Sequence, residues 1–196
     1  MIGLQSTVEQ EEARASLERH RFDGFRFFLK SVSVSLGLLQ HSAERSSHRH
    51  GQLRHLELLW LPYYLITWHV ESKERSRKIA TLVGGHERNF SLFDPEASVE
   101  TLENGEFFEP AVTRDDALDI SMTGLWRAVL NHRQNKRLLV GKRPDVEIVQ
   151  YPFWTYYFSR LGGKLDVKLL DAVTGSLAGP KGKVALLTAL ASDQGR

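Results

Sequence analysis

The sequence predicts an α+β protein made of two tandem helix–strand–strand repeats, whose antiparallel hairpins pack against helices about a pseudo-twofold axis. Residues 57–85 align with residues 147–175 at an offset of 90, without a gap and with five identities in 29 positions. Both segments carry a proline, an aromatic cluster and a final glycine at the same spacing. A repeat of this length indicates a duplicated unit.

Composition sets the class of protein. A chain of 196 residues with 41% hydrophobic side chains can bury a core, as one domain or as two small fused ones. A formal net charge of +2 argues against a protein that mainly coats nucleic acid. The lack of cysteine excludes disulfides, thiolate metal sites and cysteine nucleophiles. With no signal-peptide pattern and no apolar run long enough for a spanning helix, we expect a soluble, cytoplasmic protein.

In the first half, residues 6–21 read as a polar helix, with Ser6 and Glu9 spaced as in a capping box. Residues 24–40 fit both strand alternation and helical spacing, and the helical pattern of the second half favours a helix here. We expect strands over residues 56–70, 77–83 and 89–93.

In the second half, Thr113 can cap a helix whose apolar stripe includes Leu125 and Trp126. Strands are expected at residues 146–159 and 165–172, while residues 183–190 fit a strand or a short helix. The expected divisions are an N-terminal polar helix (1–22), repeat A (23–93), an acidic linker (94–110), repeat B (111–190) and a tail (191–196).

The end of the second hairpin has a turn with a physical rationale. Asp171 can accept hydrogen bonds from the amides two and three residues on, and Gly175 can adopt a positive φ. In the first repeat, Gly85 is the corresponding turn glycine.

This hairpin resembles the PepSY-type module, a helix followed by two antiparallel strands that end in an Asp-Ala-x-Thr-Gly turn. The residues that carry the resemblance are Gly163, Asp166, Val167, Leu170, Asp171, Ala172, Thr174 and Gly175. The segment Tyr151-Pro152-Phe153-Trp154 is also similar to segments of bacterial proteins. The resemblance covers about a quarter of the chain. It implies a binding or assembly role toward partner proteins such as peptidases, without catalysis, in modules that are usually exported or membrane-linked.

Aromatic side chains are the most unusual content of the chain. The strand at residues 146–159 is apolar on both faces, and one layer of helices covers only one face. The alternatives are core packing and an exposed face for a partner. The candidate partner-binding residues are Trp154, Tyr156, Phe158, Tyr64 and Trp68.

Histidine and arginine cluster before the first hairpin. The cationic neighbours disfavour a metal ion, so the alternatives are a solvated loop and a weak anion-binding patch. The patch consists of Arg45, His48, Arg49, His50 and Arg54. No nucleophile elbow, phosphate loop, dinucleotide fingerprint or HExxH motif is present, so we assign no catalytic residue, metal or cofactor.

The favoured function is a non-enzymatic binding or assembly protein that holds a protein partner through sheet edges and an aromatic surface, with self-association as the simplest case. One alternative is a small-ligand-binding protein or an enzyme with a pocket between the repeats, for which a pocket holding His69 or Asp171 is the expected sign. A further alternative is a module for single-stranded nucleic acid, marked by a basic stripe beside exposed Tyr and Trp side chains.

Overall fold

The computed structural model describes residues 1–19, 55–71, 76–93, 99–102, 107–130, 139–141, 143–159 and 165–194. The chain divides into two compact units. Unit 1 contains Met1–Leu4 and Pro62–Tyr151, and unit 2 contains Gln5–Leu61 and Pro152–Arg196. The chain passes between the units after Leu4 and again inside its two longest strands, so the units cut across the consecutive ranges expected for the two repeats.

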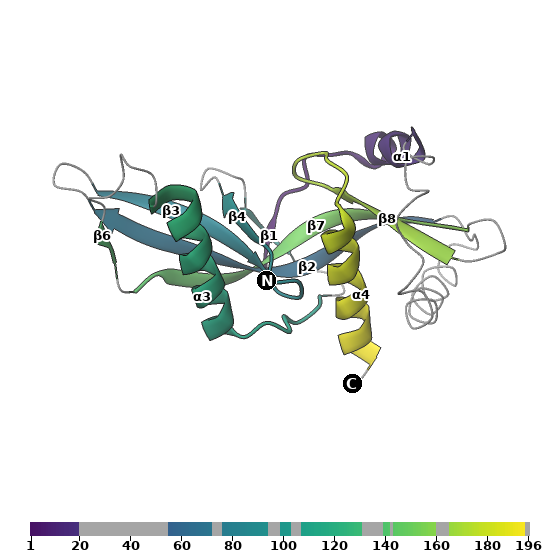
Figure 1. The fold of residues 1–196 in the computed structure, drawn as a ribbon. Coiled ribbons are helices and arrows are strands. Elements are labelled where there is room, and N and C mark those ends of the chain that lie inside the picture. The colour runs from purple at the N-terminus through teal and green to yellow at the C-terminus, as the bar shows by residue number, and fades with distance from the viewer. Residues whose placement is uncertain are drawn as a thin grey trace. The chain divides into compact units, whose positions relative to one another are not determined.

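The fold is α+β, as the sequence predicts, with a mixed sheet rather than a purely antiparallel one. The described strands are β1 (Ile2–Leu4), β2 (His55–Glu71), β3 (Ser76–Gly84), β4 (Phe90–Phe93), β5 (Val99–Thr101), β6 (Leu139–Val140), β7 (Asp145–Ser159) and β8 (Leu165–Asp171). The described helices are α1 (Gln10–Arg19), α3 (Arg114–Leu125), the π-helical turn η2 (Trp126–Leu130) and α4 (Pro180–Gln194). Figure 1 shows these elements along the chain.

In unit 1 the strand order is β4-β3-β2-β7-β1-β5, and β6 pairs with the end of β2. β1 is unexpected from the sequence, because three residues are too few to show a periodic pattern. It runs parallel to β7 at Gly3 and antiparallel to β5. β5 lies within residues 94–110, so this acidic stretch is not only a linker.

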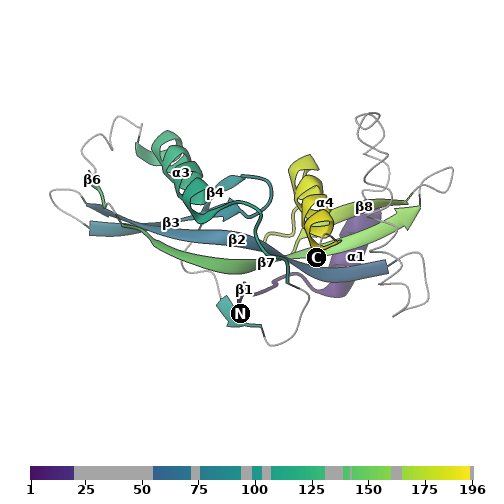
Figure 2. The same ribbon diagram turned by 90° about the horizontal axis from the view of Figure 1, so that it is seen from below.

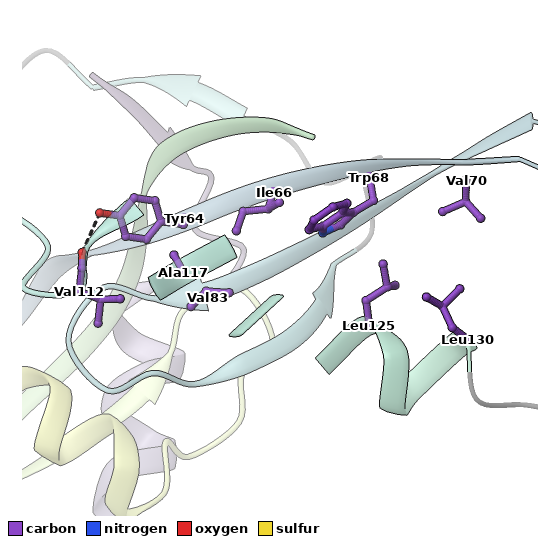
Figure 3. Packing of buried hydrophobic residues seen from close by; sticks show 9 residues of the cluster. All are labelled: Tyr64, Ile66, Trp68, Val70, Val83, Val112, Ala117, Leu125 and Leu130. Atoms are coloured by element: carbon purple, nitrogen blue, oxygen red, sulfur yellow. Dashed lines mark hydrogen bonds between the residues drawn. The ribbon is translucent and has the colours of Figure 1, made fainter. Parts of the chain in front are cut away.

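We call Pro62–Glu71 of β2 together with β3 hairpin A. Its even-numbered β2 side chains point toward α3 and form the core of unit 1 (Figure 3). These side chains are Tyr64, Ile66, Trp68 and Val70, and they pack with Val83, Val112, Ala117, Leu125 and Leu130.

Unit 2 is built on hairpin B, which consists of Pro152–Ser159 of β7 together with β8. Both α1 and α4 pack against β8, and the two views agree in placing them on opposite sides of the hairpin (Figures 1 and 2). α1 covers a cluster that contains Tyr156 and Leu170. The other face of hairpin B is buried as well, through Phe153, Thr155, Tyr157, Val167 and Leu169.

The two hairpins differ in register. Tyr63 pairs with Gly84 in hairpin A, and Phe153 pairs with Asp171 in hairpin B. The gap-free offset of 90 pairs Phe153 with Thr174 instead, three residues further along. The first strands therefore correspond at an offset of 90 and the return strands at 87. The expected superposition of Gly85 on Gly175 is wrong, because Ala172 takes the place of Gly85.

Most expected elements are confirmed: the helices at residues 6–21 and after Thr113, and all five long or short strands proposed for the two hairpins and residues 89–93. Residues 183–190 lie in α4, which resolves that ambiguity as a helix. The helix after Ser6 begins only at Gln10, so the expected capping box does not start it. Residues 24–40 lie outside the described part of the chain.

Candidate protein-binding site

In unit 1, a small set of hydrogen bonds holds the start of α3 on hairpin A. The carbonyl oxygen of Gly85 accepts hydrogen bonds from the amides of Ala111 and Val112, at 2.9 and 2.8 Å. The hydroxyl of Tyr64 donates to the carbonyl oxygen of Val112 at 2.8 Å (Figure 3). Thr113 then caps the helix, because its side-chain oxygen accepts from the amide of Asp116 at 3.2 Å.

The start of α1 is held on hairpin B by the same bonds in unit 2. The carbonyl oxygen of Ala172 accepts from the amides of Thr7 and Val8, at 2.9 and 3.1 Å. The indole Nε1 of Trp154 donates to the carbonyl oxygen of Val8 at 2.8 Å. In both units the helix begins two residues after this valine.

The apolar contacts correspond in the same way. Tyr64, Ile66 and Trp68 match Trp154, Tyr156 and Phe158 at the offset of 90, and Val83 matches Leu170 at 87. On the helices, Ala117 and Ala13 are both completely buried, and each donates its amide to the residue that precedes its helix. Each hairpin therefore offers one row of apolar, mainly aromatic side chains and one accepting carbonyl to a helix. We call this surface the docking face of the hairpin.

At the end of each docking face that lies away from the helix start, the last aromatic residue contacts a polar side chain at a matching position. In unit 1, Ser121 of α3 accepts a hydrogen bond from Trp68 Nε1 at 2.8 Å and lies 2.7 Å from the hydroxyl of Thr81. In unit 2, Lys168 takes the place of Thr81. Its ammonium group lies over the ring of Phe158 and donates to the carbonyl oxygen of Leu17.

The two helices are not equally well anchored. α3 continues into η2, and Leu125 and Leu130 extend its buried face along Trp68 and Val70 (Figure 3). α1 buries only Ala13 and Leu17 besides Val8, which precedes it. Fully burying a Val or Leu side chain contributes about 2 kcal/mol, so α1, with fewer such side chains, gains less from burial of its own residues than α3 with η2.

The expected partner-binding residues thus lie beneath helices. Tyr64, Trp68 and Tyr156 are only 5%, 4% and 8% exposed, while Trp154 and Phe158 are half-buried against the α1 cluster. We expected an exposed aromatic face because the sequence indicated helices on only one face of hairpin B. α4 supplies that cover, because it packs against β8 on the side away from α1.

The turn residues behave as expected at one hairpin and differently at the other. Asp171 Oδ1 accepts hydrogen bonds from the amides of Val173 and Thr174, at 2.8 and 2.9 Å, and Gly175 has a φ of +70°. At Gly85 the requirement is close approach. A Cβ there would lie 2.6 Å from the carbonyl oxygen of Pro62, which accepts the Gly85 amide.

Polar residues at the β3–β4 turn are a feature that the sequence analysis missed. Both ring nitrogens of His86 are buried and have no hydrogen-bond partner among the described residues, and burial lowers the pKa of this imidazole. Beside it, Tyr63 donates to Glu87 Oε1 at 3.1 Å, and Arg88 has a φ of +52°, a conformation uncommon for a residue other than glycine. The Gly-Gly-His sequence was the available signal for this turn.

The two residues named as signs of a ligand pocket, His69 and Asp171, both make polar contacts in the structure. His69 is partly exposed and lies 3.2 Å from the carboxylate of Asp145, and the Asp171 carboxylate binds its own turn amides. Burial raises the pKa of the Tyr64 hydroxyl, an effect opposed by the positive charge of Arg114, so Tyr64 remains a hydrogen-bond donor.

Unit 1 has a terminal strand in its described sheet order and several exposed apolar side chains, among them Leu92 and Trp126. β4 ends the described strand order, and Leu92 on this strand is 50% exposed. Trp126 is 58% exposed, although it was expected in the apolar stripe of its helix. The fully buried row of α3 consists of Ala117, Ser121 and Leu125 at four-residue spacing, so Trp126 lies beside this row and not in it.

The basic residues Arg45, His48, Arg49, His50 and Arg54 lie outside the described ranges. Within those ranges, no three His, Asp or Glu side chains converge as a metal site would require. None of the described helices has the length and hydropathy needed to cross a membrane. The chain matches no protein-family model, no curated protein and no solved structure.

Proposed function

We propose that this protein is a non-enzymatic assembly protein whose hairpins hold helical segments of a protein partner on their aromatic faces. The proposal includes an internal duplication, with a pseudo-twofold relation between the copies. α3, at the start of repeat B, packs on the hairpin of repeat A, and α1, which precedes repeat A, packs on the hairpin of repeat B.

One observation carries the proposal: the same docking contacts occur twice. A carbonyl accepts two consecutive amides, an aromatic donor binds the carbonyl of a valine, and an alanine one turn into the helix is fully buried. The valine and the buried alanine are of the same type in both units. The donors differ, because Tyr64 and Trp154 make the same bond with different chemical groups. Two hairpins that each hold a different helix by one set of contacts are suited to accepting a helix as a binding partner.

The polar groups of the docking faces support binding rather than catalysis. The hydroxyl of Tyr64, the indole nitrogen of Trp154 and the hydroxyl of Ser121 all bind groups within their own unit. General acid–base catalysis requires a titratable group that can reach a substrate. These groups instead fix the angle and register of a helix.

β4 ends the strand order among the described residues and gives the proposed protein a second means of contact. Edge strands present unpaired backbone groups that another chain can continue. The exposed side chain of Leu92 adds apolar area on this strand.

A peptide experiment tests the helix-receiving face. A fluorescent peptide with the sequence of residues 5–19 is titrated into the full-length chain and into its Leu17→Ala variant, and anisotropy reports binding. Leu17→Ala loosens the chain's own α1, so the peptide should bind this variant about tenfold or more tightly than the parent. The matched control is the same peptide with Ala13→Glu, which places a carboxylate at a fully buried position. Equal binding of both peptides, or no binding to the loosened chain, would contradict the proposal.

The His86 turn favours a second candidate, a small-ligand-binding protein or an enzyme. Buried ring nitrogens without partners need an explanation, such as an ordered water or a bound molecule. A high-resolution experimental structure distinguishes the two. A water on each ring nitrogen would account for His86 without a ligand, whereas density for a larger molecule would favour this second function.

A further inference from the structure

We infer that the partner held by hairpin B is a second copy of this chain, which supplies its own residues 1–19 in exchange for those of the first. This inference rests on the proposed function, since it names the partner of the same docking face. The exchanged segment consists of β1 and α1. A second copy presents the same Thr7, Val8, Ala13 and Leu17 to the same acceptors, so every contact is remade without change.

The way the helices are used within one chain favours exchange. α1 belongs to the first half of the sequence, yet it packs on a hairpin of the second half, and α3 of the second half packs on hairpin A. The docking contact is therefore made between distant segments rather than within a local helix–hairpin unit. A contact of this kind keeps its geometry whether the helix comes from the same chain or from another copy.

α1 itself buries fewer side chains than α3, which is why we place the exchange at this helix. The buried apolar side chains of the exchanged segment, among the described residues, are Leu4 of β1, Val8, Ala13 and Leu17. Those of the α3 segment are Val112, Ala117 and Leu125, with buried Ser121 beside them, and η2 adds Leu130. Because an exchanged dimer has the same contacts as the monomer, concentration controls its population by mass action.

β1 moves with α1 because Leu4 directly precedes the α1 segment. β1 pairs with β5 from Ile2 to Leu4 and with β7 at Gly3. In the exchanged dimer these bonds form with β5 and β7 of the other copy. The exchange thus adds a strand pairing to the helix contact, which gives the partner copy two points of attachment.

Engineered cysteines test the exchange without interference, because the chain contains none. The hydroxyl of Thr7 donates to the backbone carbonyl oxygen of Val173 at 2.6 Å, so the two residues are neighbours when α1 is docked. Thr7→Cys and Val173→Cys chains are mixed at equal concentration, incubated, treated with a short bifunctional thiol cross-linker, and separated on a denaturing gel. A cross-link that joins one copy of each is expected, in a yield that rises with protein concentration.

Two controls make every outcome decisive. Thr7→Cys mixed with Ser91→Cys, on the exposed β4 edge, measures random collision, and the Thr7→Cys/Val173→Cys double variant measures docking within one chain. If the double variant closes on itself while the mixed chains link no more than the Ser91→Cys control, exchange is overturned and the docking face of the proposed function stands. If neither the mixed chains nor the double variant cross-links above the Ser91→Cys control, residues 7 and 173 are not neighbours, the docking of α1 is wrong, and the proposed function fails with it.

Discussion

Tyr64 and Trp154 make one hydrogen bond with two different chemical groups. The phenol hydroxyl of Tyr64 and the indole Nε1 of Trp154 each donate, at 2.8 Å, to the carbonyl of a valine two residues before a helix. These carbonyls precede the first helical turn, so this bond fixes where the helix meets the hairpin. Hairpins A and B therefore hold their helices by the same type of bond, although the donor residues differ.

Removal of this donor should destabilise either unit. Tyr64→Phe keeps the ring but leaves the buried carbonyl of Val112 without its donor, and we expect a loss of about 1–2 kcal/mol in the free energy of unfolding. Trp154→Phe should cost at least as much, because it also removes buried ring area. Urea denaturation measures both values. Tyr156→Phe is the matched control, since its hydroxyl has no hydrogen bond among the described residues and its loss should stay within about 0.5 kcal/mol. Equal losses for all three variants would refute the role of the bond.

The hairpins were predictable because their signals are local. Aromatic and β-branched residues at alternate positions, with glycine at the ends, predict β2, β3, β7 and β8 closely. The turn at Asp171 was also predictable, because a short acceptor followed by glycine encodes its own geometry. The three-residue register difference was not, since sequence identity at Gly85 and Gly175 favoured a gap-free alignment over the pairing that the strands adopt.

Glycine substitutions separate two kinds of constraint. Gly175→Ala places a Cβ on a residue with a φ of +70° and should cost about 1 kcal/mol. Gly85→Ala should cost more, because its Cβ would meet the Pro62 carbonyl at 2.6 Å and Pro110 at 2.9 Å. Gly179→Ala is the neutral control, with no atom within 4 Å of its Cβ. Thermal melts rank the three variants, and a Gly85→Ala melt that overlays the parent would contradict the close approach.

The contact between α3 and β4 depends on Gly124. A Cβ at this position would lie 2.4 Å from the ring of Phe90, so Gly124→Ala should destabilise the protein by about 1–3 kcal/mol through overpacking. The same substitution should cost clearly less in a Phe90→Leu background, where the ring is absent. A double-mutant cycle measured in urea gives this coupling. An unchanged cost in the Phe90→Leu background would show that the ring is not the obstacle.

Acid should destabilise the fold through His86. Burial lowers the pKa of this imidazole in the folded state, so as the pH falls the unfolded chain takes up the proton first. Stability is therefore full above the ordinary histidine pKa of about 6.5 and is lost as the pH falls from there toward the lowered folded value. The difference in unfolding free energy between the parent and His86→Gln should shrink over this window. If the difference stays constant from pH 8 to pH 5, about the range in which histidines titrate, the imidazole is not buried in its neutral form.

Local sequence patterns could predict the helix α4 but not which helices pack on hairpin B. Pro180 at the first helical position and the spacing of Ala185, Leu186, Ala189 and Leu190 were available signals for α4. That two helices would cover hairpin B, and that α1 would be one of them, depended on pairing between distant segments. The periodicity of a strand does not indicate which distant helix packs on it, so the aromatic side chains were predicted to form an exposed surface.

Hydrogen exchange should rank the two docked helices. The amides of α1 are expected to exchange faster than those of α3, because α1 buries fewer side chains and its local opening costs less. Leu17→Ala should accelerate exchange in α1 and leave α3 unchanged, which serves as the internal reference. Slower exchange in α1 than in α3 would remove the basis for exchange between copies.

One helix–hairpin contact occurs twice among the described residues. An experimental structure tests this directly, through superposition of unit 2 on unit 1. We expect Val8 to fall on Val112, Ala13 on Ala117, Trp154 on Tyr64 and Ala172 on Gly85. A structure in which α1 leaves the Trp154 face, or in which Gly175 rather than Ala172 overlies Gly85, would contradict it.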